Sequence, residues 1–188
     1  MGKELKEMSL EELWQLFPIF LVKHDDNWIK YFNEEKKILL NILSDINITR
    51  IEHIGSTSIP NIYAKNIVDI LIEITEEDYL KSIDVLKTHN YMLMYQERTR
   101  AAFNKGYTKS GFAKKVFHIH LRNNGDNDEL YFRDYLIEFP KIAKEYEKLK
   151  LDLWRKFEHD RDGYTNAKSD FVKRYTFKAK MKYVNRYN

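Results

Sequence analysis

The 188-residue sequence predicts an α+β domain: a mixed β-sheet flanked by helices, with a helical C-terminal third. Strand-like segments gather in the middle of the chain, and helical patterns occur before and after them. No repeat and no Gly/Ser/Pro-rich linker divides the sequence. Because domains mostly contain roughly 100–200 residues, we expect residues 1–188 to form one domain.

Two helices are expected before the strands. Ser9 and Glu12 form a capping-box pair in front of a short helix with the sequence LEELWQLF. A second helix is predicted over residues 26–43, because apolar side chains recur near one face. These side chains are Trp28, Phe32, Leu39, Ile42 and Leu43.

The centre of the chain reads as strands separated by turns. Five strand-like segments occupy residues 48–54 (ITRIEHI), 67–74 (IVDILIEI), 91–96, 101–107 and 116–122 (VFHIHLR). A helix through residues 80–86 is expected after a capping signal at Thr75 and Asp78. A turn follows at residues 123–126, and three helices complete the chain at about 130–139, 142–157 and 166–183.

Composition and charge limit the classes of function. The absence of cysteine excludes a disulfide framework, a thiolate zinc site and a cysteine nucleophile. No apolar run approaches the roughly 20 residues of a membrane helix, and the N-terminus lacks a signal-peptide pattern, so no membrane partner and a cytoplasmic location are expected. A net charge of +3 implies no general attraction to nucleic acid, although a basic C-terminal segment keeps RNA binding as a minor alternative.

The loop after the first central strand contains Gly55 and Ser56. Glycine lets the backbone approach a ligand closely, because it has no Cβ and can take a positive φ. The hydroxyl groups and successive N–H groups that follow can bind an anion. A plain turn is the alternative interpretation.

Two carboxylates lie on one face of the strand at 67–74. Alternation along the strand places Asp69, Leu71 and Glu73 on one face and the apolar residues at even positions on the other. Asp69 is the better candidate for a metal ligand, and Glu73 is the second. Strand residues four apart are separated by roughly 13 Å, so the pair cannot share one metal without side-chain reach or a bulge. The alternative is that both simply face water on an open sheet surface.

His118 and His120 project to one side of the strand at 116–122. Their spacing suits joint contact with a ligand or metal, and it also suits two ordinary surface histidines. Zinc bound by these histidines and Asp69 is chemically conceivable, although the spacing is not typical of zinc sites. A metal-dependent hydrolase that also uses His53 is therefore a further hypothesis. If the strands at 67–74 and 116–122 are neighbours in the sheet, their polar side chains form one continuous polar surface.

Taken together, these segments resemble the GrpB-like family, a largely uncharacterised branch of the nucleotidyltransferase superfamily. The segments that carry the resemblance are IEHIGSTSIPNIYAKNIVDILIEI, HIHL, FRDYLIEFPKIAKEYEKLK and YTNAKSDFVKRY. The resemblance implies a nucleotidyltransferase-like fold. In that superfamily a Gly-Ser pair holds the nucleotide triphosphate, an Asp-x-Asp pair binds two magnesium ions, and a third carboxylate acts as base. By resemblance, Gly55 and Ser56 are the phosphate clamp and Asp69 is the first metal ligand.

This chain departs from the superfamily pattern at two positions. Leu71 stands where the second carboxylate is expected, and the later strand offers His118 and His120 in place of the third. Glu73 or Glu52 is expected to compensate, although neither stands where the superfamily pattern places a carboxylate, and a histidine or Glu73 is expected to assist as base or metal ligand.

Basic side chains are expected at the rim of the site. Lys65 lies between the Gly-Ser loop and the Asp69 strand, within reach of a phosphate. Arg133 and Lys168 are the preferred members of a cationic wall that faces the nucleotide. Further candidates for this wall are Tyr146, Lys150 and Tyr164. A helix–helix packing seam is the alternative for the same residues.

The first functional hypothesis is nucleotidyl transfer from a nucleoside triphosphate to an unknown acceptor, with Mg²⁺ as the cofactor. The second is a non-catalytic module that binds a nucleotide or another phosphorylated small molecule with the same fold. Dependence of binding on a divalent metal distinguishes the two.

Overall fold

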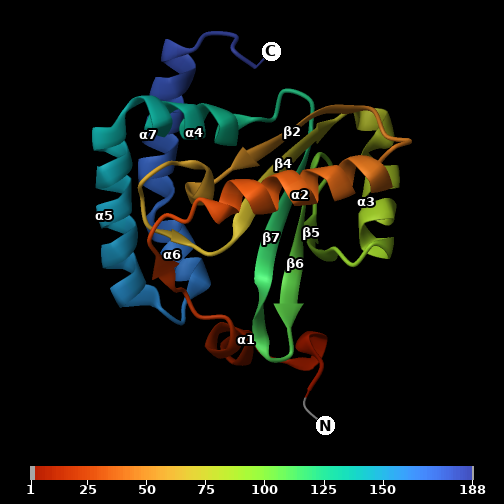
Figure 1. Ribbon diagram of the computed structural model, residues 1–188, viewed down its shortest axis with the longest axis horizontal. Helices are drawn as coiled ribbons and strands as arrows, with labels where there is room; N and C mark the ends of the chain where they lie inside the picture. The colour runs from red at the N-terminus through yellow and green to blue at the C-terminus, as the bar shows by residue number, and fades with distance from the viewer. Residues whose placement is uncertain (1–2, 188) are drawn as a thin grey trace.

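The computed structural model describes residues 3–187, which form a mixed five-stranded sheet, a separate strand pair and helices on both faces of the sheet (Figure 1). The strands of the larger sheet are β2 (Ile48–Ile54), β4 (Val68–Ile74), β5 (Met92–Gln96), β6 (Arg100–Thr108) and β7 (Gly111–Asn123). Their order across the sheet is β2-β4-β7-β6-β5. Only the β4–β7 pair is parallel among the described strands of this sheet. The two-residue strands β1 (Leu21–Val22) and β3 (Ala64–Lys65) pair separately.

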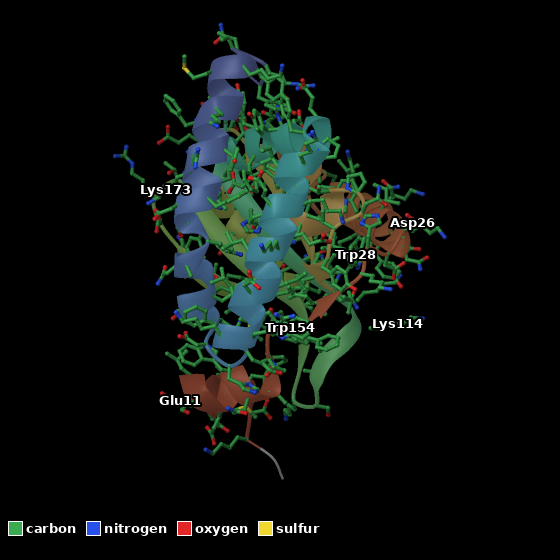
Figure 2. All side chains as sticks on the ribbon, turned by 90° about the vertical axis from the view of Figure 1, so that its left-hand side faces the viewer. Glu11, Asp26, Trp28, Lys114, Trp154 and Lys173 are labelled. Carbon is green, nitrogen blue, oxygen red and sulfur yellow. The ribbon has the colours of Figure 1, made fainter. Side chains whose placement is uncertain are left out.

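Helices lie on the two faces of the large sheet, except for the first α-helix, which lies beside the tip of the β6–β7 hairpin (Figure 1). They are α1 (Leu10–Leu16), α2 (Asn27–Ile42), α3 (Tyr79–Thr88), α4 (Asp128–Glu138), α5 (Pro140–Phe157), α6 (Arg161–Ala167) and α7 (Ser169–Lys182). Helices α2 and α3 cover one face, where Trp28, Ile70 and Ile119 belong to a common core. Helices α4 to α7 gather on the other face, and Figure 2 looks onto α5 and α7 with the sheet behind them. The α+β prediction is therefore confirmed.

Helices cover the sheet face that carries Asp69, Leu71 and Glu73. Leu71 has no exposed surface and packs with Ile54 of β2 and Leu130 of α4. Glu73 is also fully buried. The interpretation of this face as an open, hydrated surface is therefore wrong. Strand alternation identifies a face, but the helices that cover it come from distant parts of the chain.

Two predicted elements differ from those observed. The helix expected at 166–183 is observed as α7, which begins at Ser169, and an unpredicted short helix, α6, precedes it, because Asp160 Oδ1 caps this helix by accepting from Gly163 N at 2.8 Å and Lys168 ends it. The strand expected at 116–122 begins earlier, at Gly111, because it pairs with β6 as a long hairpin. The predicted capping box at Ser9 is confirmed by hydrogen bonds with Glu12 in both directions.

Within residues 3–187, no helix is both long and apolar enough to cross a membrane.

Candidate functional site

A cavity of about 770 Å³ lies between the sheet and the C-terminal helices. Ligand pockets typically have volumes of about 300–1,000 Å³, so this cavity is large enough for a small molecule. The sheet side and its loops contribute Gly55, Ser56, Lys65, Asp69, His118 and His120 to its wall. The helical side contributes Phe132, Tyr146, Lys150, Arg161, Tyr164 and Lys168. The structure thus brings seven of the nine expected site residues to one cavity.

Gly55 allows the loop after β2 to lie directly against Asp69. Its backbone has φ 70° and ψ −172°, a combination that is open essentially to glycine alone. A Cβ atom at this position would lie 2.3 Å from Asp69 Oδ2. The short helical turn η2 (Ser56–Ser58) follows, and Ser58 Oγ donates to the Gly55 carbonyl at 2.6 Å. A side chain at residue 55 would therefore displace the carboxylate.

Asp69 Oδ1 accepts hydrogen bonds from both cavity histidines. The parallel register of β4 and β7 sets Asp69 beside His118, and His120 lies one pleat further along β7. The distances to Oδ1 are 3.3 Å from His118 Nδ1 and 3.1 Å from His120 Nε2. Burial opposes the charge of Asp69, but the hydrogen bonds that it accepts from the two histidines hold its pKa well below the usual range.

The neighbours of His118 fix which of its nitrogens carries the proton. A carboxylate can only accept, so the proton lies on Nδ1, which faces Asp69. Burial lowers the pKa of His118 to about 4, so the ring is neutral near pH 7 and its Nε2 must accept. The donor is Tyr107 Oη, 2.7 Å away, which itself accepts from Arg161 Nη2 at 3.1 Å.

His120 is oriented by a similar pair of partners. Its Nε2 donates to Asp69, and its Nδ1 accepts from Arg122 Nη2 at 3.4 Å, because a guanidinium group can only donate. The lone pairs of both histidines are therefore directed at protein donors. Neither ring is arranged to bind a metal ion.

The donor set does not fit a two-magnesium centre. Leu71 occupies the position of the second carboxylate and is fully buried in apolar surroundings. Asp128 and Glu129 reach the cavity rim but pair with Lys180 and Arg122, respectively. Over the described part of the chain, no group of three or more His, Asp or Glu side chains is arranged to hold a metal ion.

His53 lies on the opposite face of the sheet from Asp69. Its ring stacks on Phe32 of α2 with centroids 5.0 Å apart, and its Nε2 lies 2.9 Å from Thr57 Oγ1. Burial lowers the pKa of His53 to about 4. A metal site that joins His53 to the cavity histidines is therefore not formed.

Positive charge dominates the cavity wall. Lys65, Lys150 and Lys168 form no ion pair with a carboxylate among the described residues. Lys65 Nζ and Lys168 Nζ lie 5.8 and 4.9 Å from the centre of the Tyr164 ring. Lys150 Nζ donates to the carbonyl of Tyr63.

The lysine ammonium groups are held in an unfavourable environment. Burial, reinforced by the charge of Lys168, lowers the pKa of Lys65 and of Lys150 to about 7. Burial also lowers the pKa of Lys168, and the charge of Asp69 opposes this shift. Together with Arg161, these lysines give the cavity four basic groups, and the charge of Asp69 compensates them only in part, since Asp128 and Glu129 pair with other side chains.

Two residues expected at the site lie elsewhere. Glu73 Oε2 is 2.5 Å from Arg50 Nε, and Glu73 Oε1 accepts from Gly125 N and Asn127 Nδ2. Arg133 Nη1 donates to Glu52 Oε2 and to the His53 carbonyl, both at 2.9 Å. Neither residue lines the cavity. Both carry structural ion pairs away from the cavity, a placement that does not match the catalytic role expected for Glu73 or the nucleotide contact expected for Arg133.

Sequence reasoning missed Arg161 and Tyr107. Arg161 belongs to a polar turn sequence, HDRDGY, that resembles any solvated loop. Tyr107 lies in β6 beyond the register shift between Lys105 and Tyr107. No local pattern indicates that either side chain reaches His118, because that contact depends on the packing of α6 against the hairpin.

The two buried neutral histidines predict acid sensitivity. The pKa values of His53 and His118 are lowered to about 4 in the folded protein, against about 6.5 in an unfolded chain. The unfolded chain therefore binds more protons between these values, and stability falls as the pH falls from about 6.5 toward 4. We expect urea unfolding to show a loss on the order of 2–4 kcal/mol between pH 7 and pH 5. His118→Asn should lose about half of this dependence, whereas a flat profile in the wild type would show that the rings are not buried in neutral form.

Comparisons with known proteins agree with this fold. Among solved structures, the conserved protein GrpB from Enterococcus faecalis superposes with a TM-score of 0.73 at 31% identity, covering 87% of this chain and 99% of that one. The Cid1 poly(U) polymerase superposes with a TM-score of 0.51 at 14% identity, covering 79% of this chain and 47% of that one. The fold is therefore that of the nucleotidyltransferase-fold proteins, and at this identity the second likeness concerns the fold alone.

The family follows from sequence similarity. The model of the GrpB family, described as GrpB protein, matches residues 18–178. The glutamate-rich protein GrpB of Alkalihalophilus pseudofirmus is 36% identical over 169 residues, covering 82% of this chain and 91% of that protein. YqkA of Bacillus subtilis is 31% identical over 170 residues, which cover 88% of this chain but only 48% of YqkA. The chain belongs to the GrpB family.

Proposed function

We propose that this chain binds a nucleoside triphosphate, or another phosphorylated small molecule, in the cavity between the sheet and the C-terminal helices. The observation that carries the proposal is a group of basic side chains that form no ion pair with a carboxylate of residues 3–187, namely Lys65, Lys150, Arg161 and Lys168. Burying unpaired charge is unfavourable, and an anion with several charges would relieve this cost. Phosphate oxygens are strong acceptors for ammonium and guanidinium donors.

The rest of the cavity suits the non-phosphate part of such a ligand. Its apolar wall includes Ile54, Phe132, Val172 and Phe177, and Phe177 has 68% of its surface exposed. Ligand sites usually combine apolar walls with a few polar groups that fix orientation. A nucleoside fits this division, with its phosphates directed toward the lysines.

Titration calorimetry with ATP tests the proposal. Lys65→Met should weaken binding at least tenfold, because one charge–phosphate contact in a partly buried site contributes more than about 1.4 kcal/mol. Lys87→Met is the matched control, since Lys87 is exposed on α3 at the opposite face of the sheet and should leave the affinity unchanged. If none of the four nucleoside triphosphates nor inorganic triphosphate binds the wild-type protein, the proposal fails.

Nucleotidyl transfer with magnesium is the second candidate function. It is favoured by the position of Asp69 in the cavity wall directly beside Gly55, as the resemblance to nucleotidyltransferases implies. Asp69 with phosphate oxygens and waters is a possible donor set for one magnesium ion, which would neutralise phosphate charge when bound. A second magnesium ion is not supported, because the buried Leu71 stands where its carboxylate ligand would be needed. Release of pyrophosphate from a nucleoside triphosphate, dependent on magnesium and absent in Asp69→Asn, would support this candidate. The acceptor and the cytoplasmic location stay predictions.

A further inference from the structure

We propose that the basic cluster of the cavity replaces the divalent metal, so that the chain binds a polyphosphate in its metal-free form. The inference rests on the proposed function and specifies the charge state of its ligand. The basic cluster is defined as Lys65, Lys150, Arg161 and Lys168.

Asp69 is the carboxylate that a metal ion in this cavity would need. Asp69 Oδ1 already accepts from His118 and His120, at 3.3 and 3.1 Å. Its Oδ2 lies in the space that a side chain on Gly55 would fill. Oδ1 is thus engaged by the protein, and a metal ion would have to compete with the two histidines for it. The task that suits this carboxylate is to orient the two histidines.

The basic cluster concentrates positive charge in the cavity. Members of the basic cluster come from four places: β3, α5, the start of α6 and the junction of α6 and α7. They affect one another electrostatically, since the charges of Lys168 and Arg161 both lower the pKa of Lys65. A divalent cation entering this cavity would meet the same repulsion. A triphosphate without metal carries more negative charge than its magnesium complex and therefore complements the cluster better.

Asp69 has opposite effects on ligand binding in the metal-bridged model and in the metal-free model. If a metal ion joins Asp69 to the phosphates, the carboxylate attracts the ligand, and its removal abolishes binding. If the basic cluster binds the phosphates directly, the carboxylate repels the ligand, and its removal strengthens binding. The charges of Lys65 and Lys168 are already coupled to that of Asp69, so the repulsion acts within the same cavity.

Calorimetric titration with ATP and with inorganic triphosphate, at constant ionic strength, separates the two models. Each titration is done in EDTA and again in millimolar magnesium, with the wild type and with Asp69→Asn. Asp84→Asn is the control for loss of one negative charge, because Asp84 is exposed on α3 at the other face of the sheet.

The expected result is that both ligands bind in EDTA and that magnesium weakens the binding or leaves it unchanged. Asp69→Asn should bind about three- to tenfold more tightly in EDTA, whereas Asp84→Asn should bind as the wild type does. Binding that appears only with magnesium would overturn the inference and support the metal-dependent candidate, while keeping the proposed function. Absence of binding under every condition would overturn both. If Asp69→Asn folds poorly, the wild-type comparison of EDTA with magnesium decides the matter alone.

Discussion

Glu73→Gln is expected to lower the free energy of unfolding by about 3 kcal/mol, because it leaves Arg50 without its buried partner. Glu73 is fully buried, and its Oε2 lies 2.5 Å from Arg50 Nε. Its other oxygen accepts from Gly125 N at 2.9 Å and from Asn127 Nδ2 at 3.1 Å, which ties the turn after β7 to β4. Urea unfolding at pH 7 measures the loss. Binding of ATP to the folded variant should be unchanged, since Glu73 does not line the cavity.

Glu77→Gln provides the comparison for this variant. Glu77 is an exposed residue of the short helical turn η3 (Glu76–Asp78), close in sequence to Glu73 but on the surface. Its substitution should change stability by less than about 0.5 kcal/mol. A stable Glu73→Gln variant with impaired ATP binding would instead restore the active role that the sequence suggested for this carboxylate.

The contrast between Asp69 and Glu73 shows what strand periodicity can and cannot predict. Alternation correctly places both on one face of β4, and the same rule correctly groups His118 with His120 on β7. The face is not uniform, however: one end opens on the cavity, and the other is closed by Leu130 of α4 and by the turn at Gly125. Those covering groups come from more than fifty residues away, so no local pattern reports them.

The basic cluster could be predicted only in part, because packing between distant segments also decides which basic side chains reach the cavity. Lys65 and Lys168 belong to segments with recognisable family motifs, and the structure brings both to the cavity. Arg161 comes to the cavity because Asp160 caps a new helix there, where periodicity alone predicts a single helix beginning at residue 166. Arg133 shows the opposite error, since its motif position suggested the cavity but its guanidinium group binds Glu52. Motifs identify side chains with a role, and packing determines what that role is.

Gly55→Ala should destabilise the protein by about 2–5 kcal/mol, combining backbone strain with overpacking. The new Cβ would lie 2.3 Å from Asp69 Oδ2 and 2.9 Å from Asp69 Cβ, so the loop or the strand must move. Movement of the carboxylate would also break its bonds with His118 and His120. Urea unfolding measures the loss of stability, and the histidine ring resonances in NMR spectra should shift in the folded variant.

Gly125→Ala separates the two contributions to this effect. Gly125 has φ 85°, yet a Cβ there would meet no atom within 4 Å, so its substitution reports strain alone, about 1–2 kcal/mol. Gly55→Ala in an Asp69→Ala background then isolates the clash, because most of the opposing side chain is gone. If the loop is held against the carboxylate as described, Gly55→Ala costs much less in that background than in the wild type. If Gly55→Ala lowers the free energy of unfolding equally in both backgrounds, backbone strain alone requires glycine at this position. The close approach of the loop to the carboxylate would then not be the reason for glycine.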